Sequence, residues 1–171
     1  MSDIKSIFIA GDGSSNLLLS WWKGLDQDRG ERSSLRRAAS PAEVVFCASF
    51  HQLLTQMRAH GYALGPTDAS ALAAVAGLAT HVKFHVGEIS LAQQMATPKS
   101  RGGGARVSGL RFRRLLAISN RDELYPMMIR IIRLLDGSVN LVSLANAVFW
   151  WNEKTKKEWA YSYYETAPTE L

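Results

Sequence analysis

The spacing of apolar residues is the feature of this chain that most limits its fold. Leu17, Leu18, Trp21, Trp22 and Leu25 recur three or four positions apart, the period of a helix that buries one face. Helical patterns of the same kind return at residues 44–57, 67–84, 108–116, 140–151 and 159–164, and a further one leads up to residue 135. A strand is predicted at most at residues 7–10, so the sequence predicts an all-α protein.

Several predicted helix ends carry residues that satisfy free backbone groups. Ser40, Pro41 and Glu43 form a capping-box pattern, in which a serine caps the helix and a glutamate follows three positions later. Gly61 and Gly137 stand where helices are expected to end in a left-handed conformation. Further caps are predicted at Thr67 or Asp68, at Ser108 and at Asn140.

A glycine-rich basic segment separates the predicted helices into two groups. Residues 97–107 contain three consecutive glycines and the cations Lys99, Arg101 and Arg106. Such a composition cannot build a core, so we expect a mobile basic loop here. We therefore predict a helical bundle of two small lobes packed together, residues 14–96 and 108–171, after an N-terminal tail of residues 1–13.

The composition argues against several classes of protein. Cys47 is the only cysteine among 171 residues, which excludes an intrachain disulfide and a cysteine-based zinc site. No apolar run reaches the ~20 residues that a membrane helix needs. The N-terminus also lacks the basic start of a signal peptide. These features predict a cytoplasmic protein with no membrane attachment.

Positive charge is concentrated in one part of the chain. The net charge is +5, and residues 97–133 hold nine Lys and Arg against two acids, a local charge of +7. The rest of the protein therefore carries a charge of −2. A basic region of this kind indicates an acidic partner, most often nucleic acid. A solvated helix face or a contact with an acidic protein is the alternative interpretation.

Arginines of two predicted helices point away from the predicted core. Because successive helical residues lie ~100° apart, Arg111 and Arg114 face away from Phe112. Arg130 and Arg133 are three positions apart and therefore neighbours on their helix. The planar guanidinium matches phosphate oxygens and can stack on bases, so these arginines are candidates for nucleic-acid contacts.

Two other patterns suggest different functions but have simpler explanations. His81 and His85, with Glu88 as a third ligand, have the spacing of a metal site on a helix, yet the metalloprotease glutamate is missing. Residues 7–15 resemble a strand and a phosphate-binding turn, but a tail leading to a Ser or Asn helix cap explains them better.

The five tryptophans suggest base stacking, but at helical spacing beside leucines they are typical of a core. In each tandem pair we expect one ring in the core and the other partly exposed, because adjacent helical residues diverge. No catalytic triad or carboxylate pair is recognisable, so we predict neither an enzyme nor a cofactor.

Several motifs follow one another in an order that points to a known family. They are residues 21–25 with Leu35-Arg36-Arg37, residues 41–44 with residues 50–53, the basic segment 110–116, residues 132–135, and the segments 144–151 and 159–164. Their order and separation resemble the CasB small-subunit family of type I-E Cascade, a CRISPR surveillance complex. Gly109 and the glycines at 102–104 depart from the family pattern.

The resemblance implies a two-lobed helical protein without catalytic residues. Such a subunit is expected to contact guide RNA and target DNA, the CasA and CasC subunits and a second copy of itself, and to stabilise the R-loop and the displaced strand in antiviral defence. The motif match proposes Arg36, Arg37, Arg111, Arg114 and Arg133 as nucleic-acid contacts. Further candidates are Arg130 from its helix spacing, Lys154, Lys156 and Lys157 as a second group, and Arg101 and Arg106 from loop charge alone. The alternative is a helical adaptor whose basic face binds an acidic protein.

Overall fold

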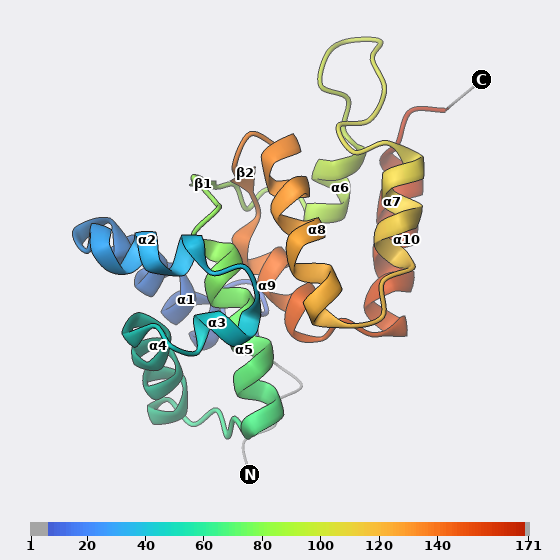
Figure 1. Cartoon of the computed structure of the whole chain (residues 1–171). Helices are drawn as coiled ribbons and strands as arrows, with labels where there is room; N and C mark the ends of the chain where they lie inside the picture. Colours follow the sequence, from blue (N-terminus) through green and yellow to red (C-terminus); the bar gives the residue numbers. More distant parts are fainter. Residues whose placement is uncertain (1–6, 170–171) are drawn as a thin grey trace.

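The computed structural model describes residues 7–169, which form a mostly helical protein (Figure 1). Its helices are α1 (Gly13–Gly24), α2 (Arg29–Arg37), α3 (Pro41–Val44), α4 (Ala48–Ala59), α5 (Pro66–Ala79), α6 (Leu91–Ala96), α7 (Gly109–Leu116), α8 (Arg121–Leu134), α9 (Leu141–Phe149) and α10 (Glu153–Thr166). A 3-10 turn, η2 (Leu25–Gln27), follows α1, and two short strands, β1 (Phe84–His85) and β2 (Ser138–Val139), complete the fold. The predicted helical class is confirmed. Within residues 7–169, no helix is long and apolar enough to cross a membrane.

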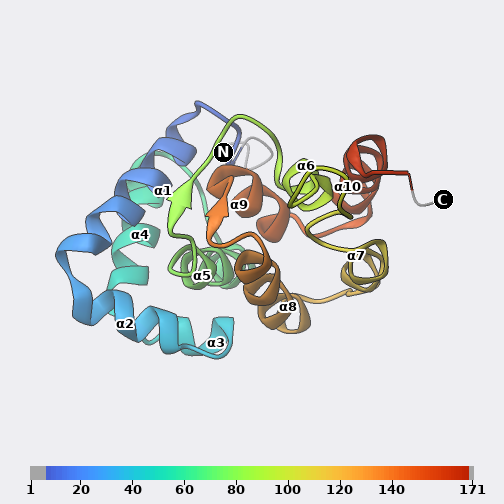
Figure 2. The ribbon, with the colours of Figure 1, turned by 90° about the horizontal axis from the view of Figure 1, so that it is seen from above.

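Helix α5 lies at the centre of the fold, as Figures 1 and 2 show from two directions. All its residues from 71 to 79 are buried, and most of them are alanines. Small side chains let neighbouring helices approach closely, and α3, α8 and α9 all contact this helix. At Gly77 the fit is tight enough that a β-carbon would lie 2.8 Å from Val44 Cγ2.

The alanine-rich helix ends at Ala79, earlier than the end near Phe84 that the sequence predicts. Beyond it, the backbone N–H groups of Lys83 and Phe84 donate to Gly137 O at 2.9 and 3.1 Å. β1 then pairs in parallel with β2, so a distant segment supplies the hydrogen bonds that further helical turns would have made. His85 therefore lies in a strand, and the helical spacing behind the suggested metal site does not exist.

The prediction of a strand at residues 7–10 is wrong. Phe8 has a φ of +60°, and its N–H donates to Ser14 Oγ at 2.8 Å, so the chain turns here instead of extending. Asp12, not a serine or asparagine, caps α1, because Asp12 Oδ1 accepts from Ser15 N at 2.8 Å. The Phe8 side chain is buried and meets Phe149 edge to face.

Most of the predicted helix ends are confirmed. Ser40, Ser108 and Asn140 cap α3, α7 and α9, and each side chain accepts from the backbone N–H three residues later. Gly61 and Gly137 follow the ends of α4 and α8 with φ of +95° and +76°, the left-handed conformation that glycine adopts without strain.

The predicted cap of the alanine-rich helix is wrong by two or three residues. Gly65 occupies the cap position and Pro66 is the first helical residue. Asp68 lies inside the first turn, where its Oδ2 accepts from Gly65 N at 3.0 Å. A proline needs no hydrogen-bond partner for its nitrogen, so it fits the first turn and moves the helix start forward.

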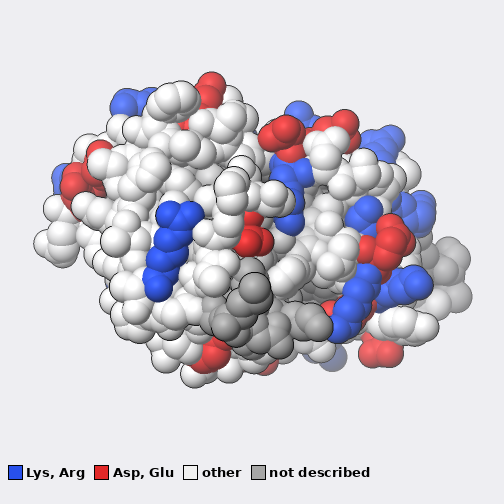
Figure 3. All heavy atoms as spheres, turned by 90° about the horizontal axis from the view of Figure 1, so that it is seen from below, with Lys and Arg blue, Asp and Glu red and all other residues white. Residues whose placement is uncertain are grey.

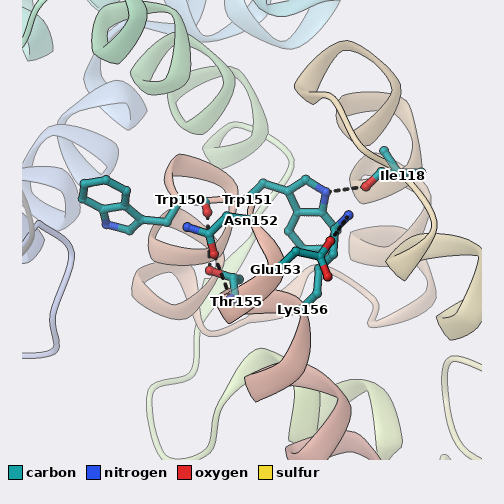
Figure 4. A network of polar contacts seen from close by, with 7 residues as sticks. All are labelled: Ile118, Trp150, Trp151, Asn152, Glu153, Thr155 and Lys156. Atoms are coloured by element: carbon teal, nitrogen blue, oxygen red, sulfur yellow. Dashed lines mark hydrogen bonds and ion pairs between the residues drawn. The ribbon is translucent and has the colours of Figure 1, made fainter.

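One hydrophobic core joins the helices before and after the basic loop. Trp21, Trp151 and Trp159 are buried in it, whereas Trp22 and Trp150 are half-buried, so each tandem pair has one core ring. Trp21 and Trp22 lie on α1, but Trp150 and Trp151 lie beyond the end of α9, not on a helix as predicted. Figure 4 shows Trp150 and Trp151 pointing in opposite directions, with Trp151 Nε1 donating to Ile118 O at 2.8 Å. The interpretation of these tryptophans as core residues is confirmed for the buried three.

The basic loop at residues 97–107 projects from the body next to the C-terminal segment (Figure 1). Its base is closed by an antiparallel bridge between Pro98 and Ala105 and by the Arg106 N–H, which donates to Thr97 O at 3.0 Å. Val107 N donates to Met95 O at 2.9 Å, which ties the loop to the end of α6. The loop thus has a fixed base, and its glycines form the tip.

Candidate nucleic-acid interface

The ends of α2 and α8 place two of the predicted arginines near one buried histidine. Arg36 lies in the last turn of α2 and Arg133 in the last turn of α8, and both side chains are exposed. Both helices contact α5, and His81 lies just past the end of α5. Burial, together with the positive charges of Arg36 and Arg133, lowers the pKa of His81 to about 4. One buried ring therefore lies within reach of two arginines that are distant in the sequence.

The two histidines serve the fold and carry no charge to the surface. His81 is 7% exposed, and neither of its ring nitrogens has a hydrogen-bond partner among the described residues. His85 Nδ1 accepts from Leu141 N at 3.1 Å, so one of its nitrogens is already used. Within residues 7–169, no group of three or more potential metal ligands lies together.

Two lysines that the sequence did not single out lie near the β1–β2 pair. Lys23 on α1 lies close enough to His85 to lower its pKa, after the larger effect of burial. The stem of Lys83 lies against Gly137, where an added β-carbon would be 2.8 Å from Lys83 Cγ. We call Lys23, Arg36, Lys83 and Arg133 the α2–α8 cluster. Its elements surround the β1–β2 pair in the view from above (Figure 2). Nothing in linear spacing relates the two lysines to Arg133, so only the folded chain identifies them.

The α7 arginines form a second basic surface. Phe112 and Leu115 are buried, while Arg111, Arg113 and Arg114 are exposed on the other side of the helix. This arrangement confirms that the arginines face away from the core, although their contact with nucleic acid stays a prediction. Arg101 lies in the loop that leads to this helix and is also exposed.

Other cations of the sequence have partners within the protein. Arg106 forms an ion pair with Asp136 at 3.8 Å, and Lys156 forms one with Glu153 at the same distance. Lys156 Nζ also lies 5.5 Å from the Trp151 ring centre (Figure 4). Arg121, one of the nine cations of the basic stretch, donates from Nε to Val148 O at 2.9 Å and so caps the end of α9. These side chains stabilise the fold and are weaker candidates for an interface.

The remaining candidates are available for a partner. Those that are exposed and form no ion pair with any described residue are Arg36, Arg37, Arg101, Arg111, Arg114, Arg130, Arg133, Lys154 and Lys157. The face seen from below carries scattered cations, and at the right of Figure 3 they lie beside acidic side chains. Intermixed charges neutralise one another, so this lower face is a poorer match for a polyanion than the α2–α8 cluster.

Known proteins share both a sequence pattern and the fold with this chain. A family model described as CRISPR-associated protein Cse2 matches residues 31–164. A chain in the crystal structure of E. coli Cascade bound to a PAM-containing dsDNA target superposes with a TM-score of 0.67 at 16% identity, covering 88% of this chain and 97% of that one. CasB from Thermus thermophilus superposes with a TM-score of 0.64 at 21% identity and the same coverage of both chains. No curated protein is significantly similar to the chain in sequence.

Proposed function

Because the chain belongs to the Cse2/CasB family of type I-E Cascade, we propose that it is a non-catalytic nucleic-acid-binding subunit of such a complex. In this role it stabilises the pairing of guide RNA with target DNA, the R-loop, together with the displaced strand, in antiviral defence. Its protein partners are the CasA and CasC subunits and a second copy of itself, and it acts in the cytoplasm. The E. coli relative sits in a Cascade bound to duplex DNA, which supports this assignment.

The observation that carries the proposal is that Arg36 and Arg133 both lie near the buried His81, where their positive charges act on its pKa. Neither guanidinium has an ion-pair partner among the described residues, so both are free to bind phosphate oxygens. The buried ring below them is neutral, so it offers no countercharge. A polyanion is therefore the partner that best completes this surface.

The energetics of strand exchange explain how such contacts help. Replacing a DNA duplex with an RNA–DNA duplex is nearly balanced, so protein contacts to the backbone decide the direction. Contacts between arginine and phosphate do not depend on the identity of the base. A subunit that binds in this way can act on any target, while the guide RNA reads the sequence. The α2–α8 cluster and the α7 arginines provide such contacts on two surfaces around one hydrophobic core.

The test is fluorescence-anisotropy binding to unrelated oligonucleotides, single- and double-stranded, over a series of salt concentrations. For the wild type we expect affinity to fall steeply with salt and to be independent of sequence. The double variant Arg36→Ala/Arg133→Ala should reduce the slope of log affinity against log salt by about 1.5, since each lost phosphate contact removes roughly 0.7–0.9. The pair Arg111→Ala/Arg114→Ala should act in the same way.

Arg32→Ala is a suitable control, because it removes a cation from α2 that already pairs with Asp26. Its salt slope should stay close to that of the wild type. An equal effect of Arg32→Ala would show that net charge alone matters and would remove the case for the α2–α8 cluster. No binding by the wild type even at low salt would instead favour the adaptor with an acidic protein partner.

A further inference from the structure

A cavity of about 480 Å³ lies between the basic loop, the start of α7 and the end of α10. Its walls include the backbone of residues 102–105, Gly109, Arg113, Tyr163 and Tyr164. Arg113 is not among the contacts that the motif match proposes. The cavity lies apart from the α2–α8 cluster, with which it shares no residue.

One wall of the cavity is bare backbone. Residues 102–104 are glycines, and a β-carbon added at Gly102 or Gly104 would meet nothing within 4 Å. Gly103 N donates to Ser100 O at 3.0 Å, which holds the tip in a turn above the bridge of Pro98 and Ala105. A wall of this kind lets a flat group approach closely and offers peptide groups to its polar edge.

The facing wall is aromatic and rigid. The Tyr163 ring is buried and stacks on Phe112 with ring centres 3.9 Å apart, while its hydroxyl donates to Val107 O at 2.6 Å. Tyr164 meets Phe112 and Tyr163 at right angles, with ring centres at 5.8 and 5.2 Å. Tyr164 is nevertheless 53% exposed, so its ring is positioned by its neighbours and still has surface that a ligand in the cavity can contact.

The cavity also carries positive charge. Arg113 is exposed and makes no ion pair with any residue between 7 and 169. Gly109 is the first residue of α7, so the positive end of the helix dipole lies at the same wall. The lining therefore favours both an anion, at Arg113, and a flat ring, at Tyr164, and a nucleotide combines these two groups.

We propose that this cavity holds one unstacked nucleotide of a single strand, with its base against Tyr164 and its phosphate at Arg113. The inference rests on the proposed nucleic-acid function and adds a preference to it. A duplex keeps its bases paired and stacked, so it cannot place a base in the cavity without paying to open a pair. Single strands should therefore bind more tightly than duplexes of the same length.

The first experiment compares Tyr164→Ala, Tyr164→Phe and Tyr161→Ala in anisotropy binding to one unrelated sequence, presented as a single strand and as a duplex. Tyr161 is a matched control, since it lies three residues earlier on α10, is 72% exposed and does not line the cavity. Tyr164→Ala should lower the ratio of single-strand to duplex affinity about fivefold or more, the effect of losing one stacked base. Tyr164→Phe and Tyr161→Ala should keep the ratio of the wild type.

A second experiment needs no variant. Single strands in which abasic residues replace the nucleotides keep all phosphates but offer no base, so the wild type should bind them about fivefold or more weakly. If abasic strands bind as well as normal ones, or if Tyr164→Ala matches Tyr161→Ala, the nucleotide cavity is refuted while salt-dependent binding by the arginines stands. If the wild type binds neither strands nor duplexes, the proposed function itself fails.

Discussion

Replacing Gly77 with alanine tests the packing around the central helix, because sequence and structure predict opposite effects. Gly77 lies inside α5 between alanines. Judged by helix propensity alone, Gly77→Ala should stabilise the protein by about 1 kcal/mol. In the folded protein the new methyl group would lie 2.8 Å from Val44 Cγ2, and Tyr125 Oη would be closer still.

The magnitude follows from these two contacts. Overpacking of a dense core costs about 1–3 kcal/mol, since neighbours must leave their preferred positions. Tyr125 Oη also donates to Ala38 O at 3.4 Å, and moving it weakens that bond by about 1 kcal/mol. Set against the gain in propensity, we expect a net loss of about 1–3 kcal/mol in the free energy of unfolding. For a protein of this size, that lowers the melting temperature by about 2–12 °C.

Urea denaturation and thermal melting of four variants, including Tyr125→Phe alone, check the reasoning. Gly24→Ala is the control, because a β-carbon there meets nothing within 4 Å and the φ of −61° suits alanine, so it should stabilise the protein slightly. Adding Tyr125→Phe to Gly77→Ala removes the closest clash and should cost less than the sum of the single changes. A Gly77→Ala protein as stable as Gly24→Ala would refute the packing argument.

Two further predictions concern buried side chains. Trp21→Ala should destabilise the fold by about 3–5 kcal/mol, since it empties a core site and leaves Ser49 O without the indole donor at 2.9 Å; an unchanged melting temperature would contradict this. His81, with a pKa of about 4 in the folded protein against 6.5 in the unfolded chain, should make stability fall as the pH drops from 6.5 towards 4. In this pH range the unfolded chain binds a proton at His81 and the folded protein does not, which lowers the free energy of unfolding by up to about 3 kcal/mol. His81→Leu should flatten this dependence in urea titrations, and equal pH slopes for both proteins would exclude His81 as its source.

The helices and most of their ends were predictable because the interactions that set them are local. At the start of α3, the Ser40 side chain accepts from the backbone N–H of Glu43, only three residues away. The period of the apolar residues likewise shows which face of a helix is buried. Trp21 and Trp22 on α1 follow the same geometry, which separates adjacent helical side chains by ~100°. The resemblance in motif order was likewise a property of the linear chain, and it identified the family.

Two of the errors come from partners that lie far away in the sequence. The alanine-rich helix stops at Ala79 without a clear signal in the sequence, and Gly137 O then accepts from the N–H groups of Lys83 and Phe84. The strand expected at residues 7–10 is a different case, because the nearby Ser14 and Asp12 side chains hold a turn there. In the sequence Arg121 is one more cation of the basic stretch, but in the structure it donates to Val148 O at the end of α9.

From the amino-acid sequence alone came the helical class, the family, and the list of arginines, because each depends on neighbours along the chain or on composition. Only the tertiary structure decided which cations meet. Arg36 and Arg133 both lie near His81, just past the end of α5, because α2 and α8 both pack on that helix. Charge can be counted along a sequence, but electrostatic attraction depends on distance through space, and folding alone sets that distance.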